Sequence, residues 1–269
     1  MVVAKKTVRG GSGAGAKVAI VTGGTRGIGL GVARELLGRG YKVAVCSRDP
    51  KEVASGMKVL ERFCEAEGAS ALSASARVFG VVCDVSVAGD WAKMVAAVMR
   101  KWGRIDVLVN NAGILVQKPL MDTMWEDMEK VLHVNLLGAF LGMKACVPHM
   151  RGGSAIVNVA SVAGLKAFPA LSAYCSAKFA LVGLTKVAAL DLAAKGIRVN
   201  VVCPGLIDTP MVADIMKNKA AREGLLSRIP LGRAGVPADI GAMVGFLADG
   251  KASGYCTGGT YVVDGGMAV

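Results

Sequence analysis

Short aliphatic runs recur along this chain and are separated by longer stretches with helical periodicity. A strand that is apolar on both faces belongs to a parallel sheet that helices cover on both sides. The composition agrees, since 53% of the residues are hydrophobic but only 5% are aromatic. The sequence therefore predicts an α/β fold with an aliphatic core. The clearest runs are residues 18–21, 43–45, 105–109 and 156–159.

The order of these patterns narrows the topology. Strand-like and helix-like segments alternate from residue 17 onward, and Gly40 and Gly68 follow the first two helical segments, where glycine commonly ends a helix. Nothing in residues 17–269 resembles a linker, so we expect one domain with a Rossmann-like, doubly wound parallel sheet flanked by helices. The expected strands are residues 17–22, 41–46, 78–83, 105–109, 154–159, 197–202 and 260–263. The expected helices are residues 27–39, 50–67, 87–102, two stretches within 121–150, 172–195 and 237–248.

Two segments fall outside this alternation. Residues 1–16 are basic, rich in Gly and Ser and free of acidic residues, which predicts a flexible extension. They lack the apolar centre of a secretory signal, and an organelle-targeting remnant is the alternative to a simple tail. Residues 204–233 are too long for an ordinary connection, which predicts a mobile lid, with a partly helical loop without a gating role as the alternative.

Composition and charge also indicate which classes of binding partner are expected. The net charge is +12, yet lysine and arginine are scattered and do not alternate with aromatic residues. A solvated surface is therefore favoured over nucleic-acid binding, and an anionic cofactor or an acyl-carrier substrate would also suit the charge. Uncharged apolar stretches stay below the roughly 18–20 residues of a membrane span, so no membrane association is expected.

The seven cysteines are odd in number and form no Cys-x-x-Cys. They are typical of reduced core residues in a cytosol-like compartment. Only His133 and His149 are available as histidine ligands, so no metal site is expected.

A glycine-rich turn follows the first apolar run. Residues 22–29 read Thr-Gly-Gly-Thr-Arg-Gly-Ile-Gly and lead into a helical pattern. A strand, a glycine turn and a helix N-terminus form the arrangement that binds a dinucleotide pyrophosphate. Glycines often serve only turns and close packing, so this motif alone is weak.

A second pattern suggests proton transfer. Tyr174 and Lys178 stand four residues apart, which puts a phenol and an ammonium on one helical face, and Ser161 lies thirteen residues upstream. The cation would favour phenolate and bring a group of pKa about 10 toward working pH. In isolation such a pair is more often a surface pair. Together with the glycine turn, it indicates a dehydrogenase.

The spacing of these motifs resembles that of the classical short-chain dehydrogenase/reductase family from residue 17 to residue 266. Members often have Ser-Ser where this chain has Ala160-Ser161, with the second serine functional. The matching motifs are Thr-Gly-x-x-x-Gly-x-Gly at 22–29, Asn-Asn-Ala-Gly at 110–113, Asn135, Ser161, Tyr174 with Lys178, Pro204-Gly205, and Val-Asp-Gly-Gly at 263–266.

The resemblance implies roles for four residues. Tyr174 would donate or remove the proton at a carbonyl or alcohol oxygen, and Ser161 would hydrogen-bond the same oxygen. Lys178 would lower the pKa of Tyr174 and bind the nicotinamide ribose, and Asn135 would hold a water that links Lys178 to solvent. The cofactor contacts implied are Gly23, Thr25, Arg26, Gly27, Ile28, Gly29, Ser47, Arg48, Asp84, Val85, Asn111, Ala112, Gly113, Tyr174, Lys178, Pro204, Gly205, Ile207 and Thr209.

The residues after the second strand predict which cofactor is used. An NAD enzyme usually places Asp or Glu there for the ribose hydroxyls, whereas here Ser47 and Arg48 follow Cys46 and Arg26 lies in the glycine turn. A guanidinium suits a 2′-phosphate. Asp49, which precedes Pro50, is expected to cap the next helix. The sequence thus favours NADP(H) over NAD(H).

The substrate is less constrained. Residues 226–233 and 246–248 look like those of 3-oxoacyl-acyl-carrier-protein reductases, but polyol, sugar and steroid dehydrogenases share this likeness. A ketone, an alcohol or an acyl thioester is therefore expected, and a non-catalytic cofactor-binding scaffold is the other alternative. The resemblance further implies a homotetramer, with a dimer as the alternative that the sequence leaves open. We expect a cytoplasmic protein, or one of an organelle matrix if the N-terminal extension is a targeting remnant.

Overall fold

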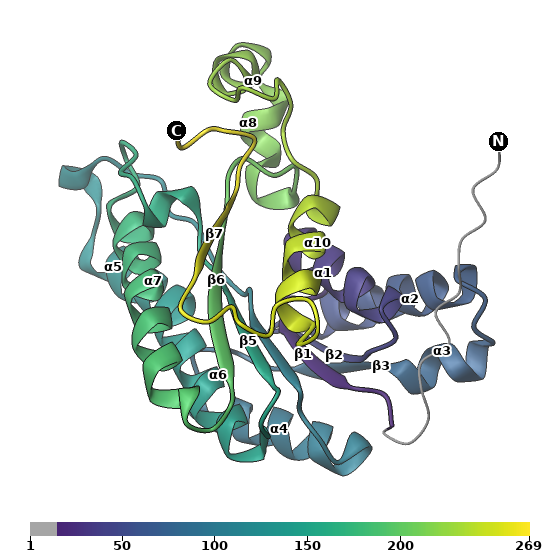
Figure 1. Cartoon of the computed structure of the whole chain (residues 1–269). Coiled ribbons are helices and arrows are strands. Elements are labelled where there is room, and N and C mark those ends of the chain that lie inside the picture. Colours follow the sequence, from purple (N-terminus) through teal and green to yellow (C-terminus); the bar gives the residue numbers. More distant parts are fainter. Residues whose placement is uncertain (1–14) are drawn as a thin grey trace.

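The computed structural model describes residues 15–269 and contains one seven-stranded parallel sheet in the order β3-β2-β1-β4-β5-β6-β7 (Figure 1). The strand order reverses between β1 and β4, so a crevice opens at the carboxyl ends of these strands. The Rossmann-like fold expected from the sequence is confirmed. The predicted extension lies almost entirely outside the described residues. The strands are β1 (Val18–Thr22), β2 (Lys42–Ser47), β3 (Val78–Val82), β4 (Val107–Asn110), β5 (Ala155–Val159), β6 (Arg198–Pro204) and β7 (Thr260–Val263).

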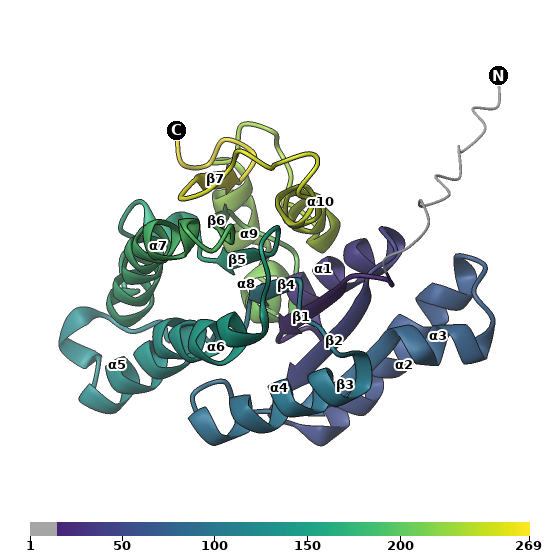
Figure 2. The ribbon, with the colours of Figure 1, turned by 60° about the horizontal axis from the view of Figure 1, so that its bottom comes forward.

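Helices cover both faces of the sheet (Figure 2). On one face α1, α2 and α10 pack on the sheet, and on the other face α4, α6 and α7 do so. The helices are α1 (Gly27–Gly38), α2 (Pro50–Ala66), α3 (Ala71–Arg77), α4 (Ala88–Trp102), α5 (Trp125–Leu132), α6 (Gly138–Cys146), α7 (Ser172–Ala193), α8 (Ala213–Lys217), α9 (Lys219–Leu226) and α10 (Pro237–Ala248). Short turns are η1 (Leu120–Asp122), η2 (His133–Leu137), η3 (Val147–His149), η4 (Val162–Gly164) and η5 (Pro210–Val212).

The alternation of side chains along each strand divides the core in two. In β1, Ala19 and Val21 face the layer of α1 and α10, whereas Val18 and Ile20 face the layer of α4, α6 and α7. All four are fully buried. Each strand must therefore be apolar on both faces, which explains the aliphatic runs.

Two helical regions differ from the sequence expectation. Helix α3 was not predicted; its N-cap is Ser70, whose hydroxyl accepts a hydrogen bond from the Ser73 amide at 3.2 Å. Between α5 and α6 the helix forms a π turn, η2, rather than a simple break. Such single π turns occur frequently at functional sites.

The predicted lid segment is folded in part as η5, α8 and α9, which rise above the carboxyl ends of the strands (Figure 1). Gating by this segment stays a prediction.

Two helical stretches are long and apolar enough to cross a membrane by length and composition alone. They are Trp125–His149 and Ser172–Ala193, and half or less of each is buried. Both contribute residues to the core on the sheet, which accounts for part of their apolar character.

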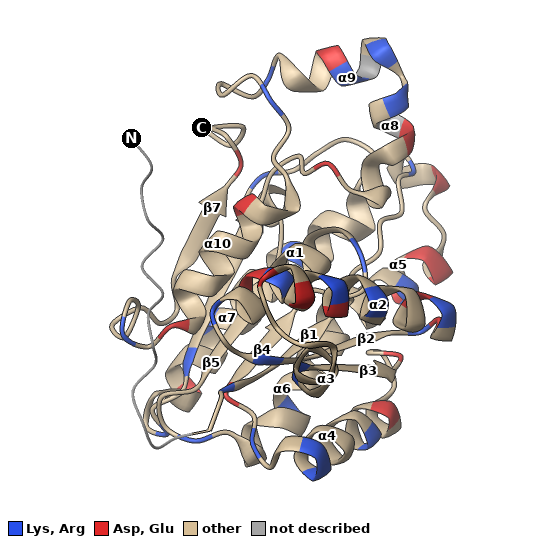
Figure 3. Ribbon diagram, turned by 90° about the vertical axis from the view of Figure 1, so that its right-hand side faces the viewer, with Lys and Arg blue, Asp and Glu red and all other residues tan. Residues whose placement is uncertain are grey.

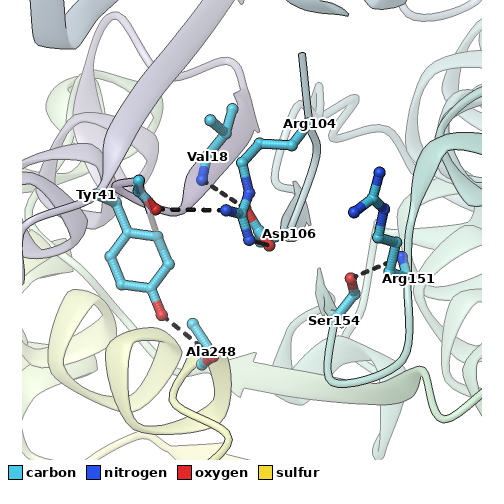
Figure 4. Close-up of polar contacts among 8 residues, drawn as sticks. Val18, Tyr41, Arg104, Asp106, Arg151, Ser154 and Ala248 are labelled. Carbon is cyan, nitrogen blue, oxygen red and sulfur yellow. Dashed lines mark hydrogen bonds and ion pairs between the residues drawn. The ribbon is translucent and has the colours of Figure 1, made fainter. Parts of the chain in front are cut away.

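At the amino-terminal ends of the strands, opposite the edge above which the α8–α9 segment lies, polar side chains connect neighbouring elements (Figure 4). The Asp106 carboxylate accepts hydrogen bonds from the Val18 amide at 2.8 Å and from the Arg104 guanidinium at 2.8 and 2.7 Å. Nearby, the Tyr41 hydroxyl donates to the carbonyl of Ala248 at 3.3 Å. These contacts fasten β1 to the start of β4 and α10 to β2, far from the carboxyl edge.

Charged residues are mixed over the surface. Lysine and arginine on α2, α4 and the α8–α9 segment lie among aspartate and glutamate (Figure 3). A mixed distribution of this kind favours a solvated surface over a nucleic-acid site.

Candidate active site

The carboxyl ends of β1, β2, β4 and β5 line a cavity of about 850 Å³. It extends from the glycine turn and the end of β2 to the first two turns of α7, which carry Tyr174 and Lys178. A cavity at the point where the strand order reverses is the usual ligand site of such sheets.

The glycine turn is shaped for close approach. Gly23 and Gly27 have φ of +60° and +52°, a conformation that side chains disfavour. A Cβ built on Gly29 would lie 2.1 Å from the carbonyl oxygen of Gly23, so a side chain there would disrupt the turn. Asn111 supports the turn by donating to the carbonyl of Thr22 at 2.8 Å.

The donors of this turn fit a dinucleotide phosphate. Helix α1 begins at Gly27 without a side-chain cap, which leaves its first amide groups available for an anion. The buried hydroxyl of Thr25 has no hydrogen-bond partner among the residues that the structure describes. A buried hydroxyl normally finds a partner, and a bound phosphate would supply one.

At the end of β2 the predicted adenosine side of the cavity contains both bases and acids. Asp49 caps α2, since its carboxylate accepts from the Lys51 amide at 2.8 Å and Pro50 follows it. The expectation that Asp49 is a helix cap is confirmed. Arg48 Nη1 lies 3.9 Å from the Asp84 carboxylate. This region thus holds exposed guanidinium groups next to carboxylates.

Tyr174 and Lys178 lie together on α7, as their spacing predicts. Lys178 Nζ is 5.6 Å from the centre of the Tyr174 ring and donates to the carbonyl of Val159 at 2.8 Å. Burial lowers the pKa of Lys178 to about 8. Burial raises the pKa of Tyr174 to about 12, although a hydrogen bond with Ser161 opposes this shift. The sequence predicted a lowered pKa for Tyr174, whereas the structure raises it, because desolvation of the phenol outweighs the effects that favour phenolate.

Asn135 lies in the η2 turn and is buried. Its side-chain oxygen accepts from the Ile114 amide at 2.8 Å, and its amide nitrogen donates to the Ile114 carbonyl at 2.9 Å. A Cβ built on Gly113 would be 3.3 Å from the Asn135 oxygen and 3.7 Å from Lys178 Nζ. Asn135 therefore fixes the loop after β4 beside Lys178, and both of its polar side-chain atoms already have protein partners.

Most of the predicted cofactor contacts lie on the cavity wall, but three do not. Pro204 ends β6, Gly205 packs against Asp264, and Ile207 lies in the hydrophobic core. For these three residues the cofactor contact stays a prediction. The predicted residues on the wall are Gly23, Thr25, Arg26, Gly27, Ile28, Gly29, Ser47, Arg48, Asp84, Val85, Asn111, Ala112, Gly113, Tyr174, Lys178 and Thr209.

Sequence reasoning missed Glu52, which also lines the cavity. Its carboxylate accepts a hydrogen bond from the Ser47 hydroxyl at 2.6 Å and lies 3.5 Å from Arg26 Nε. One signal could have identified it. Glu52 stands three residues after the predicted cap Asp49, and helical side chains point back toward the helix N-terminus, here toward the end of β2.

Metal ligands are not grouped in the part of the chain that the structure describes. Within residues 15–269, no cluster of three or more His, Cys, Asp or Glu side chains could hold an ion. The seven cysteines are all unpaired thiols, and six of them are buried.

Known proteins resemble the chain over nearly its full described length. A family model described as Enoyl-(Acyl carrier protein) reductase matches residues 23–268. The 2-(R)-hydroxypropyl-CoM dehydrogenase of Xanthobacter autotrophicus is 41% identical over 254 residues, which cover 93% of this chain and 97% of that protein. The L-2,3-butanediol dehydrogenase of Corynebacterium glutamicum is 36% identical over 265 residues, covering 93% and 98%. A crystal structure of a dehydrogenase/reductase from Sinorhizobium meliloti 1021 has a TM-score of 0.85 at 32% identity, covering 94% and 95%.

The chain therefore belongs to the short-chain dehydrogenase/reductase family, as its motifs predicted. It is an oxidoreductase of that family that acts on alcohols, and the family uses a nicotinamide cofactor.

Proposed function

We propose that this oxidoreductase uses NADP(H) to interconvert a ketone and a secondary alcohol. The observation that carries the proposal is a single cavity whose wall includes Tyr174 and Lys178 as well as Arg26, Ser47 and Arg48. The first two residues supply proton-transfer chemistry, and the other three supply groups that suit a phosphate.

The bound nicotinamide would supply or accept the hydride. Tyr174 holds its proton, because burial raises its pKa to about 12, and its hydrogen bond with Ser161 shows that the two hydroxyls are neighbours. Two neighbouring hydroxyls can bind a carbonyl oxygen, and the phenol can donate its proton as negative charge develops there. Lys178 keeps its position through Val159 and stands next to the phenol. It is suited to bind the nicotinamide ribose and to return a proton to Tyr174.

The preference for NADP(H) is supported by the end of β2. Ser47 and Arg48 are the first residues past Cys46, and both line the cavity. The Asp49 carboxylate is the N-cap of α2 and accepts from the Lys51 amide. An arginine fork binds phosphate through paired hydrogen bonds, whereas a ribose without phosphate is usually bound by an acid at this point.

For the substrate, we propose a small ketone or secondary alcohol, with a 3-oxoacyl thioester as one form. The alternative is a polyol, sugar or steroid alcohol. Relatives are named for a hydroxypropyl thioether and for a diol, which supports a secondary alcohol as the common feature. Ile114, Leu115 and Met211 add apolar surface to the cavity wall. A panel of ketones, diols and acyl thioesters would separate these classes.

For the assembly, we propose a homotetramer in the cytoplasm. The outer faces of α6 and α7 support self-association, because large apolar side chains stay exposed there. Exposed apolar patches often mark interfaces between protein chains. The residues are Phe140 on α6 and Phe179, Val187 and Leu190 on α7.

Fluorescence titration of the protein with NADPH and with NADH tests the cofactor proposal. We expect tighter binding of NADPH, followed by oxidation of bound NADPH when a suitable ketone is added. Tighter binding of NADH would contradict the proposed cofactor, and a failure of every ketone and thioester in the panel would contradict the reaction.

A further inference from the structure

An acid and a base already neutralise each other where the proposed function needs a phosphate site. Glu52 is the only residue that contacts both Ser47 and Arg26 among the ion pairs and side-chain hydrogen bonds of the described residues. Its two carboxylate oxygens are divided between them, at 2.6 Å from Ser47 Oγ and 3.5 Å from Arg26 Nε. The carboxylate thus occupies donors that suit a 2′-phosphate.

The position of Glu52 is fixed by the helix that carries it. The backbone of α2 is anchored by the Asp49 cap and Pro50, and Glu52 follows in the first turn. A carboxylate there interacts favourably with the helix dipole. Its side chain is one-third exposed, so it is close to solvent and can part from Arg26 without being buried alone.

The second arginine of this region is less strongly paired. Arg48 Nη1 lies 3.9 Å from Oδ2 of Asp84, and the other carboxylate oxygen, Oδ1, accepts from the Ser86 hydroxyl at 2.6 Å. Asp84 is therefore shared between Arg48 and Ser86, whereas both oxygens of Glu52 face the groups of the proposed phosphate site. Of the two acids, Glu52 is the one positioned to compete with a phosphate.

We propose that Glu52 is a specificity-determining residue, whose carboxylate competes with the 2′-phosphate of NADP for Arg26 and Ser47. The inference rests on the proposed NADP(H) preference and deepens it. Binding of the phosphate displaces Glu52 from Arg26 and places two anions near each other. Glu52 thereby lowers the affinity for NADP, while NAD, which has no 2′-phosphate, avoids this competition.

The competition is modest because the groups are partly exposed. Arg26 is about two-thirds exposed and Glu52 one-third, and a pair of this kind contributes on the order of 1 kcal/mol or less. Since about 1.4 kcal/mol corresponds to a tenfold change in affinity, removing the charge of Glu52 should change phosphate binding by about threefold to fivefold.

The test uses two fragments of the cofactor, adenosine 2′,5′-bisphosphate and 5′-AMP, in calorimetric titrations that need no turnover. The variant Glu52→Gln removes the charge but keeps an oxygen that can accept from Ser47. The matched control is Glu65→Gln, which makes the same charge change on an exposed residue of α2 outside the cavity. Thermal melting of each variant shows that it is folded.

We expect Glu52→Gln to bind the bisphosphate about threefold to fivefold more tightly than the wild type and 5′-AMP within about twofold, while Glu65→Gln changes neither. Unchanged bisphosphate affinity, weaker binding of 5′-AMP, or an equal gain in Glu65→Gln would overturn the proposal. Weaker 5′-AMP binding would mean that Glu52 binds ribose hydroxyls. The proposed function fails separately if the wild type binds 5′-AMP more tightly than the bisphosphate, whatever the variants do.

Discussion

Replacement of Tyr174 by Phe is the most direct test of the proposed chemistry. The ring keeps its place on α7, but the variant lacks the hydroxyl that is hydrogen-bonded to Ser161. Because burial raises the pKa of this phenol to about 12, the wild type carries the proton at neutral pH and can donate it. Loss of a general acid removes about 10²- to 10⁴-fold of rate, so turnover should fall at least about 10²-fold, or roughly 2.7 kcal/mol in the barrier.

Cofactor binding should change little in the same variant. Lys178 is held by the carbonyl of Val159 at 2.8 Å and not by the phenol, so it stays in place when the hydroxyl is removed. The measurements are ketone reduction at saturating NADPH and a fluorescence titration of NADPH. Tyr41→Phe is the matched control, because it removes a hydroxyl that bonds Ala248 at the opposite edge of the sheet. Retention of more than a tenth of wild-type turnover in Tyr174→Phe would refute the reasoning.

Three further predictions follow from the site. Burial lowers the pKa of Lys178 to about 8 from 10.5, so its charged form costs stability below about pH 8 and this cost fades as the pH rises toward 10.5. Lys178→Met should therefore have a higher melting temperature than the wild type at pH 7 and lose most of that difference at pH 10.5. The variant should also bind cofactor less tightly and have a lower turnover rate. A difference in melting temperature that does not depend on pH would contradict this prediction. The double change Ser47→Asp with Arg48→Ala should make NADH the tighter ligand in a titration, and an unchanged preference would exclude these residues as the selectors. A metal chelator should leave activity and melting temperature unchanged, whereas a loss restored by one added metal would show that a metal is required.

The sheet was predictable because burial on both faces leaves a direct mark on the sequence. Val18 to Val21 pack alternately into two core layers, so each position must be apolar and the run identifies a strand. Helix α3 leaves no such mark. Residues 71–77 consist mainly of Ala and Ser, of which only Ala74 is buried, so no apolar periodicity distinguishes them from a loop.

The proximity of Tyr174 and Lys178 was predictable from their spacing, but their protonation was not. Spacing shows that a cation lies near a phenol, and this alone favours phenolate. The opposing effect comes from the chain segments that enclose them, including Val159 at the end of β5 and the loop at Gly113. These segments lie far away in sequence, so the cost of desolvation can be judged only once the fold is known.

Glu52 shows how cofactor selectivity can be misjudged from the residues at one strand end. The sequence after Cys46 offers Ser47 and Arg48, with no acid in the position that usually binds a ribose. The structure brings a carboxylate to the same point from the first turn of α2, where it contacts Ser47 and Arg26. The net charge at the predicted phosphate site therefore depends on residues of both β2 and α2, and on how these two elements are oriented relative to each other. A helix cap at Asp49 followed by an acid three residues later indicates such a contribution, because helical side chains point toward the N-terminus that faces the strand end.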